Sequence, residues 1–125
     1  MMRPVPRQVR TVLWLGCLAS AFVATHVPPG HLHTEHWPND LVLHGLGFFA
    51  LGLVTVWRLT GDRHGVGRTV GRWLLLLGGY AAMDEWTQPL VGRSCELADW
   101  LADVSGAALG LAAASLWFAA FPPGR

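Results

Sequence analysis

The chain alternates between long apolar stretches and short polar connections. Uncharged or nearly uncharged stretches occupy residues 11–27, 41–57, 73–91 and 100–121. At about 1.5 Å per residue, each would form a helix roughly 25 to 33 Å long, which matches the hydrocarbon core of a bilayer, about 30 Å thick. The pattern therefore predicts an all-α fold, an integral membrane bundle of four helices.

A soluble four-helix bundle is the alternative, and each of its helices would carry a polar face with a period of about 3.6 residues. Residues 46–57, 73–83 and 107–121 contain no charged side chain. Of the 125 residues, 52% are hydrophobic and 14% are charged, whereas an ordinary soluble domain has about 25% charged residues. We therefore favour the membrane bundle, built as a single domain of residues 1–125 because no linker divides the chain.

Basic residues are distributed unevenly among the connections. Arginines precede the first stretch and fill the second connection, namely Arg3, Arg7, Arg10, Arg58, Arg63, Arg68 and Arg72. The first connection has no Lys or Arg, and the third has only Arg93. Because basic connections stay on the cytoplasmic side, we expect a multi-pass protein of the cytoplasmic membrane with both termini in the cytoplasm.

The first stretch also resembles a secretory signal, since a basic start is followed by an apolar run and the small residues Ala19, Ser20 and Ala21. The apolar run continues past these residues to Val27. This continuation favours an uncleaved membrane helix.

Polar residues within the predicted membrane helices lie toward the outer end. They are His44 on the second helix, Asp84, Glu85 and Gln88 on the third, and Asp103 on the fourth, with Asp40, Arg93, Glu96 and Asp99 at the boundary. At about 100° per residue, each helix gathers its polar residues on one face. Pro89 lacks an N–H and is expected to kink the end of the third helix. The pattern predicts a polar cup that opens to the outside.

The cup has two interpretations. Ionisable residues inside a membrane usually mark a functional site. Alternatively, the same residues form a hydrogen-bonded network that only fixes the order of the helices. Gly106 and Gly110 lie on the polar stripe of the fourth helix, and their spacing is typical of close packing between helices.

These residues also form a characteristic series. It consists of Asp84-Glu85-Trp86-Thr87-Gln88, then Gly92-Arg93, then Asp99, Asp103, Gly106 and Gly110, with Asp40 and His44 upstream. The series resembles the signature of the VanZ-like membrane proteins, D-E-x-x-Q, G-R and D-x-x-x-N-x-x-G-x-x-x-G, preceded by D-K-x-x-H. The resemblance implies an all-helical integral membrane protein, associated in some members with low-level resistance to teicoplanin, and it implies no established reaction.

The chain departs from that signature at three points. Leu41 replaces the usual Lys, Asp103 replaces the usual Asn, and the stretch between Gln88 and Arg93 is about one residue shorter. Losing a cation and gaining an acid makes this cup more acidic than the family pattern.

Two kinds of function are compatible with the cup. In the first, it binds a lipid headgroup or a cell-wall (peptidoglycan) precursor, with Arg93 pairing an anionic group. The candidate ligand-binding residues are Asp40, His44, Asp84, Glu85, Gln88, Arg93, Asp99 and Asp103. In the second, Asp84 or Glu85 acts as a general acid or base with His44 on an envelope lipid or precursor. Binding asks less of the sequence, so we prefer it, and catalysis stays open.

Other partners find little support in the sequence. The net charge of +1 and the absence of a basic run argue against nucleic acid. No phosphate-binding glycine loop is present, so we expect no cofactor. The first connection is rich in metal-ligating residues, namely His26, His31, His33, Glu35 and His36. A loop so rich in Pro and Gly does not hold a tetrahedron by itself, so we expect an adventitious metal site or none in this loop. Cys17 and Cys95 are expected to be free thiols, and the sequence predicts no oligomeric state.

Overall fold

The computed structural model describes residues 5–28, 40–60 and 66–122 and consists there of helices without a β-strand. The α-helices are α1 (Arg7–Thr25), α2 (Asp40–Leu59), α3 (Val66–Thr87) and α4 (Leu97–Ala120). A short 3₁₀ turn, η2 (Gln88–Val91), follows α3 directly. The prediction of an all-α chain with four helices is confirmed.

The helix boundaries differ from the predicted ones because the helical backbone extends beyond the apolar stretches. α1 and α3 begin four and seven residues earlier than the apolar stretches 11–27 and 73–91. Arginines are good helix formers, so the helices continue through basic segments that the apolar pattern leaves outside them. Arg10 also donates to the backbone oxygens of Trp57 and Thr60, which satisfies carbonyl groups at the end of α2.

The predicted helix 73–91 is wrong in its last turn. The α-helix ends at Thr87, and the backbone tightens into η2 because Pro89 has no N–H to donate. Gly92 then reverses the chain with a φ of 79°, a left-handed conformation that favours glycine. The kink expected from Pro89 is therefore a change of helix type followed by a turn.

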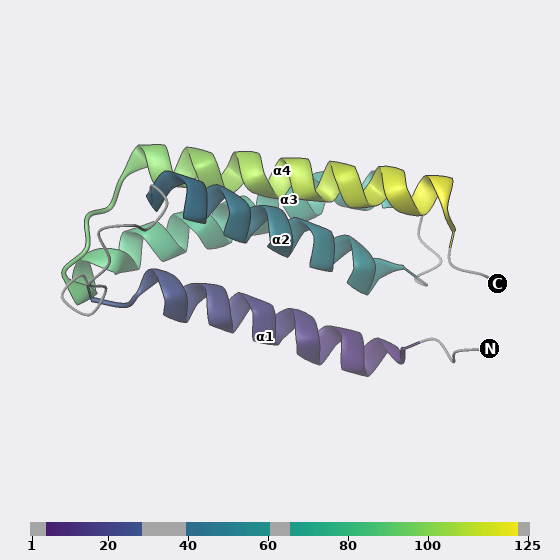
Figure 1. Ribbon diagram of the computed structural model, residues 1–125, viewed down its shortest axis with the longest axis horizontal. Coiled ribbons are helices and arrows are strands. Elements are labelled where there is room, and N and C mark those ends of the chain that lie inside the picture. The colour runs from purple at the N-terminus through teal and green to yellow at the C-terminus, as the bar shows by residue number, and fades with distance from the viewer. Residues whose placement is uncertain (1–4, 29–39, 61–65, 123–125) are drawn as a thin grey trace.

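The four α-helices run alongside one another, each antiparallel to the next along the chain (Figure 1). α1 begins and α4 ends at the same end of the bundle, which we call the terminal end. The opposite end, where α1 ends, α2 begins, α3 ends and α4 begins, is called the cluster end.

α2 and α4 form the tightest contact in the bundle. A Cβ atom added to Gly106 would collide with the backbone oxygen of Gly45, and one added to Gly110 would collide with that of Phe49. A Cβ on Gly52 would lie 2.7 Å from the backbone oxygen of Ala107. The close packing predicted for Gly106 and Gly110 is confirmed, and it brings two helix backbones together without intervening side chains.

The core is formed by three helices. Its buried apolar residues are Phe48, Leu51 and Val56 on α2, Leu77 and Ala81 on α3, and Ala107, Leu111 and Ala114 on α4. α1 has no fully buried residue. It is held by hydrogen bonds from Trp14 Nε1 to Thr55 Oγ1 (2.9 Å) and from Tyr80 Oη to the backbone oxygen of Leu18 (2.7 Å). α1 is therefore the most loosely packed helix.

The outer surface of the bundle is apolar. Large side chains such as Val12, Leu75 and Leu116 are 68%, 78% and 72% exposed. α1, α2 and α4 are each long and apolar enough to cross a membrane. α3 is less apolar because it contains Arg72 near its start and Asp84 and Glu85 near its end. The part of the chain that the structure describes thus has three helices suited to spanning a bilayer, and the crossing by α3 stays a prediction.

Candidate functional site

A group of polar side chains, most of them buried or half-buried, occupies the cluster end and is here called the polar cluster. It comprises Thr25 at the end of α1, His26 directly after it, Asp40 and His44 of α2, Asp84 and Glu85 of α3, Gln88 of η2, Arg93, and Asp99 and Asp103 of α4. All eight residues proposed from the sequence as ligand-binding belong to it. The chain thus brings together residues from every helix at one end of an otherwise apolar bundle.

His44 is the centre of the cluster. Its Nδ1 lies 3.0 Å from Oδ1 of Asp103 and 3.7 Å from Oε1 of Glu85, and its side chain is 2% exposed. A carboxylate can only accept a hydrogen bond, so the Nδ1–H group of a neutral His44 donates to Asp103 and Nε2 carries the lone pair. Within residues 5–28, 40–60 and 66–122, neither His44 Nε2 nor Asp103 Oδ2 has a hydrogen-bond partner.

Glu85 connects α3 with the start of α4. Its Oε1 accepts a hydrogen bond from Gln88 Nε2 (3.0 Å), and its Oε2 accepts one from the backbone N–H of Glu96 (3.0 Å). Glu96 is the N-cap residue of α4. Both oxygens of this buried carboxylate are therefore engaged in holding two helix ends together.

Asp84 connects α3 with α1. Its Oδ1 accepts a hydrogen bond from Thr25 Oγ1 (2.9 Å), and its Oδ2 accepts a weaker one from Gln88 Nε2 (3.4 Å). Nδ1 of His26 lies 3.7 Å from Oδ1 of Asp84, and the Nε2 atom of the same ring lies 2.9 Å from Thr87 Oγ1. Asp84 contacts α1, whereas Glu85 faces His44 and α4.

Thr25 and His26 are site residues that the sequence pattern does not single out. Thr25 lies in a stretch interpreted only as an apolar helix, and His26 belongs by sequence to the histidine-rich connection. The signal in the sequence is their position at the end of the first helix, at the depth of the other polar residues. The remaining members of that connection, His31, His33, Glu35 and His36, lie outside the described residues.

Arg93 lies at the solvent-exposed edge of the polar cluster. Its Nη2 forms an ion pair with Oδ2 of Asp40, whose side chain is 52% exposed, and its Nε donates to Gln88 Oε1 (3.3 Å). The side chain of Arg93 itself is 13% exposed. Because half of the Asp40 side chain is open to solvent, the pair contributes only about 0–1 kcal/mol, and Arg93 can change partners at low cost.

A cavity of about 410 Å³ reaches the cluster between α1 and α2. Its polar lining is formed by Thr25, Asp40, His44 and Arg93, and its apolar lining by Ala21, Ala24, Val27, Leu43, Gly47 and Phe48. A second cavity of about 570 Å³ continues between the same helices and shares Ala21 and Gly47 with the first. The two form a groove, polar at the cluster end and apolar along its length.

The predicted site residues thus fall into two groups. Asp40, His44 and Arg93 line the cavity. The other five are between 0% and 7% exposed and do not line it, namely Asp84, Glu85, Gln88, Asp99 and Asp103. For the acid/base alternative, Glu85 is within 3.7 Å of His44. The hydrogen bonds of Asp84 go to Thr25 and Gln88.

The cluster end is rich in negative charge. In the described part of the chain it holds six carboxyl groups, those of Asp40, Asp84, Glu85, Glu96, Asp99 and Asp103, against the guanidinium of Arg93 and the imidazoles of His26 and His44. Buried carboxylates need cations, hydrogen bonds or protons to balance them. The excess of acid therefore favours a cationic group in or beside the cluster.

Both cysteines are free, as predicted, with Cys17 half-buried on α1 and Cys95 exposed before α4.

No protein-family model, curated protein or solved structure matches this chain. The resemblance to the VanZ-like proteins therefore stays a prediction based on the motif residues.

Proposed function

We propose that this chain is a multi-pass protein of the cytoplasmic membrane that binds an amphiphile of the cell envelope. The polar head of a lipid or of a lipid-linked cell-wall precursor would contact Asp40, His44 and Arg93. Its hydrocarbon chain would lie in the groove between α1 and α2.

The charge distribution supports four membrane crossings with the cluster end outside. Arg7, Arg10 and Arg58 lie at the terminal end, and the acidic residues lie at the other end. The guanidinium of Arg58 lies 5.2 Å from the ring of Trp14 and 5.5 Å from that of Trp73, an arrangement typical of aromatic side chains at a membrane interface. By the positive-inside rule, the terminal end faces the cytoplasm.

The groove is the observation that carries the proposal. A ligand that is polar at one end and apolar along its length matches a cavity that is lined in the same way. Small residues such as Ala21 and Gly47 line both parts of the groove and leave room for a hydrocarbon chain. The loose packing of α1 allows the groove to widen, because α1 has no fully buried residue.

Recognition of the head would rest on Arg93. A guanidinium pairs well with phosphate or carboxylate, and its present partner, Asp40, lies at the surface. The link to teicoplanin susceptibility belongs to the same proposal and rests on the family resemblance.

Filling the groove tests the proposal. A Cβ at Gly47 would have no atom within 4 Å, so the backbone there has room for a side chain and Gly47→Leu places one in the groove. Gly79→Leu on α3 is the matched control, since a Cβ there also meets nothing within 4 Å and Gly79 does not line the groove. Native mass spectrometry of the protein purified in mild detergent measures the retained lipid. Teicoplanin susceptibility of a host carrying each variant measures the phenotype.

The expected result is lipid bound to the wild type and to Gly79→Leu, and a loss of most of that lipid from Gly47→Leu at unchanged thermal stability. If the Gly47→Leu protein keeps as much lipid as the wild type, or if the wild type holds none, the binding proposal is wrong. A lipid-binding protein without any effect on susceptibility would refute only the resistance link.

A further inference from the structure

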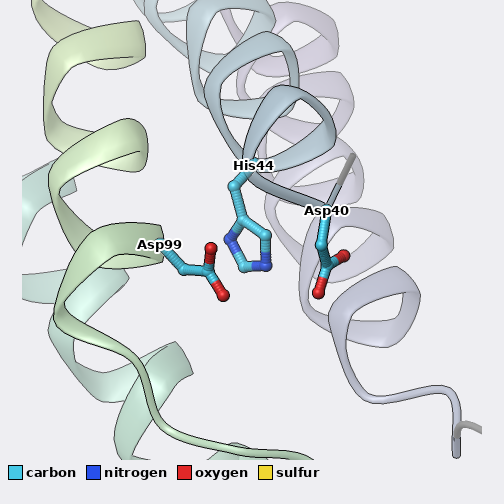
Figure 2. A group of neighbouring side chains, drawn as sticks. All are labelled: Asp40, His44 and Asp99. Carbon is cyan, nitrogen blue, oxygen red and sulfur yellow. The ribbon is translucent and has the colours of Figure 1, made fainter. Parts of the chain in front are cut away.

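We propose that Asp40, His44 and Asp99 bind one divalent transition-metal ion, of the Zn²⁺ class, at the cluster end. Figure 2 shows the ring of His44 lying between the carboxyl groups of Asp40 and Asp99. One potential ligand atom from each of the three side chains lies within 4.8 Å of the other two. This inference concerns a metal site that shares Asp40 and His44 with the residues proposed to contact the lipid head, but it does not require that an amphiphile binds.

Helix geometry explains how the three residues meet. Asp40 and His44 are one turn apart at the start of α2, so their side chains lie on the same face. Asp99 lies in the first turn of α4, the helix that packs closely against α2. The sequence predicts no metal here because the spacing of residues on α2 and α4 does not reveal which helices are neighbours.

The unpartnered nitrogen of His44 points to a ligand. His44 is 4% exposed, and its Nε2 has no hydrogen-bond partner among the described residues. A buried polar atom without a partner is destabilising, because it has lost its hydrogen bonds to water. A metal ion bound at Nε2 removes this destabilisation.

Asp103 prepares His44 for this role. The bond between His44 Nδ1 and Asp103 Oδ1, 3.0 Å long, fixes the ring, and in the neutral imidazole it leaves the lone pair on Nε2. Metal-binding histidines commonly donate their other N–H to a carboxylate in this way. Asp103 is thus a positioning residue and not a ligand.

A second combination, His44 with Glu85 and Asp103, also brings three ligand atoms within 4.8 Å of one another. Both oxygens of Glu85 in this combination already accept hydrogen bonds, and Asp103 holds Nδ1 of His44 through Oδ1, which leaves only its Oδ2 without a partner among the described residues. In the proposed site, Arg93 pairs with only one oxygen of Asp40, Oδ2. The other oxygen of that carboxylate can face the metal.

The donor set selects the ion. One imidazole and two carboxylates suit Zn²⁺ or Mn²⁺, whereas Mg²⁺ and Ca²⁺ prefer oxygen alone. Ligand atoms around tetrahedral Zn²⁺ are about 3.4 Å apart, so the side chains need to close slightly around the ion. A dication also offsets part of the acidic excess at this end. Because Asp40 and His44 line the cavity, the positions left open on the ion face it.

Metal binding is measured on the full chain, purified in detergent with a tag that contains no histidine and stripped with a chelator. His31→Ala, His33→Ala, Glu35→Ala and His36→Ala form the background, so that these residues of the histidine-rich connection do not contribute. Calorimetric titration with Zn²⁺, together with metal analysis, is expected to give one ion per chain. Mn²⁺ is expected to bind more weakly and Mg²⁺ more weakly still.

Three variants locate the ion. Asp99→Asn and Asp40→Asn are each expected to weaken Zn²⁺ binding by more than about tenfold, since each removes a charged ligand. Glu96→Gln is the matched control, an exposed acid at the same end outside the three ligands, and is expected to bind as the wild type does. Asp40 is half exposed, so Asp40→Asn still tests the site even if Asp99→Asn fails to fold.

The proposal is overturned if the wild type binds no Zn²⁺, or if Asp40→Asn binds it with wild-type affinity. Loss of binding in Glu85→Gln but not in Asp99→Asn would place the ion in the other group and would also refute the site. Lipid retention in the same preparations separates the proposals, since a protein that holds lipid but no Zn²⁺ refutes the metal site alone.

Discussion

His44 on α2 and Asp103 on α4 are 59 positions apart in the sequence, yet Nδ1 of His44 lies 3.0 Å from Oδ1 of Asp103. Both side chains are buried. Their contact depends on the glycine contact next to it, where Gly45 and Gly106 allow the backbones of α2 and α4 to touch. The fold and the site are therefore coupled through the distance between these two helices.

Gly106→Ala is expected to destabilise the bundle. The added methyl group would collide with the backbone oxygen of Gly45, which has no rotamer by which to move away. Overpacking of this kind typically costs about 1–3 kcal/mol, so the midpoint of thermal unfolding in detergent should fall by several degrees.

Gly79→Ala is the control for Gly106→Ala. A Cβ at Gly79 meets nothing within 4 Å, and alanine is favoured over glycine inside a helix by about 1 kcal/mol. Its stability should equal or exceed that of the wild type. Equal stability of the two variants would show that α2 and α4 do not pack as described.

The helices could be predicted from the sequence because each long apolar stretch has the length that a membrane-spanning helix needs. The helix ends could not be predicted in this way. The apolar stretch starts at residue 11, but the helix already begins at Arg7 and includes Arg10. The spacing of Gly106 and Gly110 predicted a close contact but not its partner, which the structure identifies as α2. Which helix packs against which depends on how well the shapes of two helix faces fit together. The residue pattern of one helix does not give this information.

The same limit applies to the site. Depth along the helices indicated that Asp84, Glu85 and His44 would lie at one end, and they do. It did not show that Asp84 binds Thr25 of α1 or that His44 binds Asp103 of α4. Depth is a property of one helix, whereas the rotation of each helix about its axis is set by packing.

Asp103→Asn is expected to keep the fold and weaken metal binding. Asparagine retains an oxygen that accepts the Nδ1–H of His44 but loses the negative charge that makes Nε2 a better ligand. Removal of such a supporting carboxylate costs about 10–100-fold in metal affinity. Zn²⁺ titration and thermal unfolding of the metal-free variant separate this effect from a change in stability. Wild-type Zn²⁺ affinity in the variant would refute the positioning role of Asp103.

Cys95 provides a direct test of orientation. It is exposed in the segment between η2 and α4, whereas Cys17 lies on α1 within an apolar span. A maleimide that does not cross membranes is therefore expected to label Cys95 on intact cells and to leave Cys17 unlabelled. Cys95→Ser should abolish the labelling. Labelling that requires permeabilised cells would place the cluster end in the cytoplasm and reverse the proposed topology.

Arg93→Gln is expected to reduce binding of anionic amphiphiles while sparing the fold. The change removes the ion pair with Asp40, which is exposed and contributes about 0–1 kcal/mol, and it removes the cation that faces the cavity. Glu85→Gln is the comparison, because Glu85 is buried, does not line the cavity and holds the start of α4. Native mass spectrometry should therefore show anionic lipid lost from Arg93→Gln and retained by Glu85→Gln, whereas thermal unfolding should show the larger change in Glu85→Gln. If the two variants lose lipid equally, the carboxylates behind the cavity matter as much as the cation in it, and recognition of the head by Arg93 is refuted.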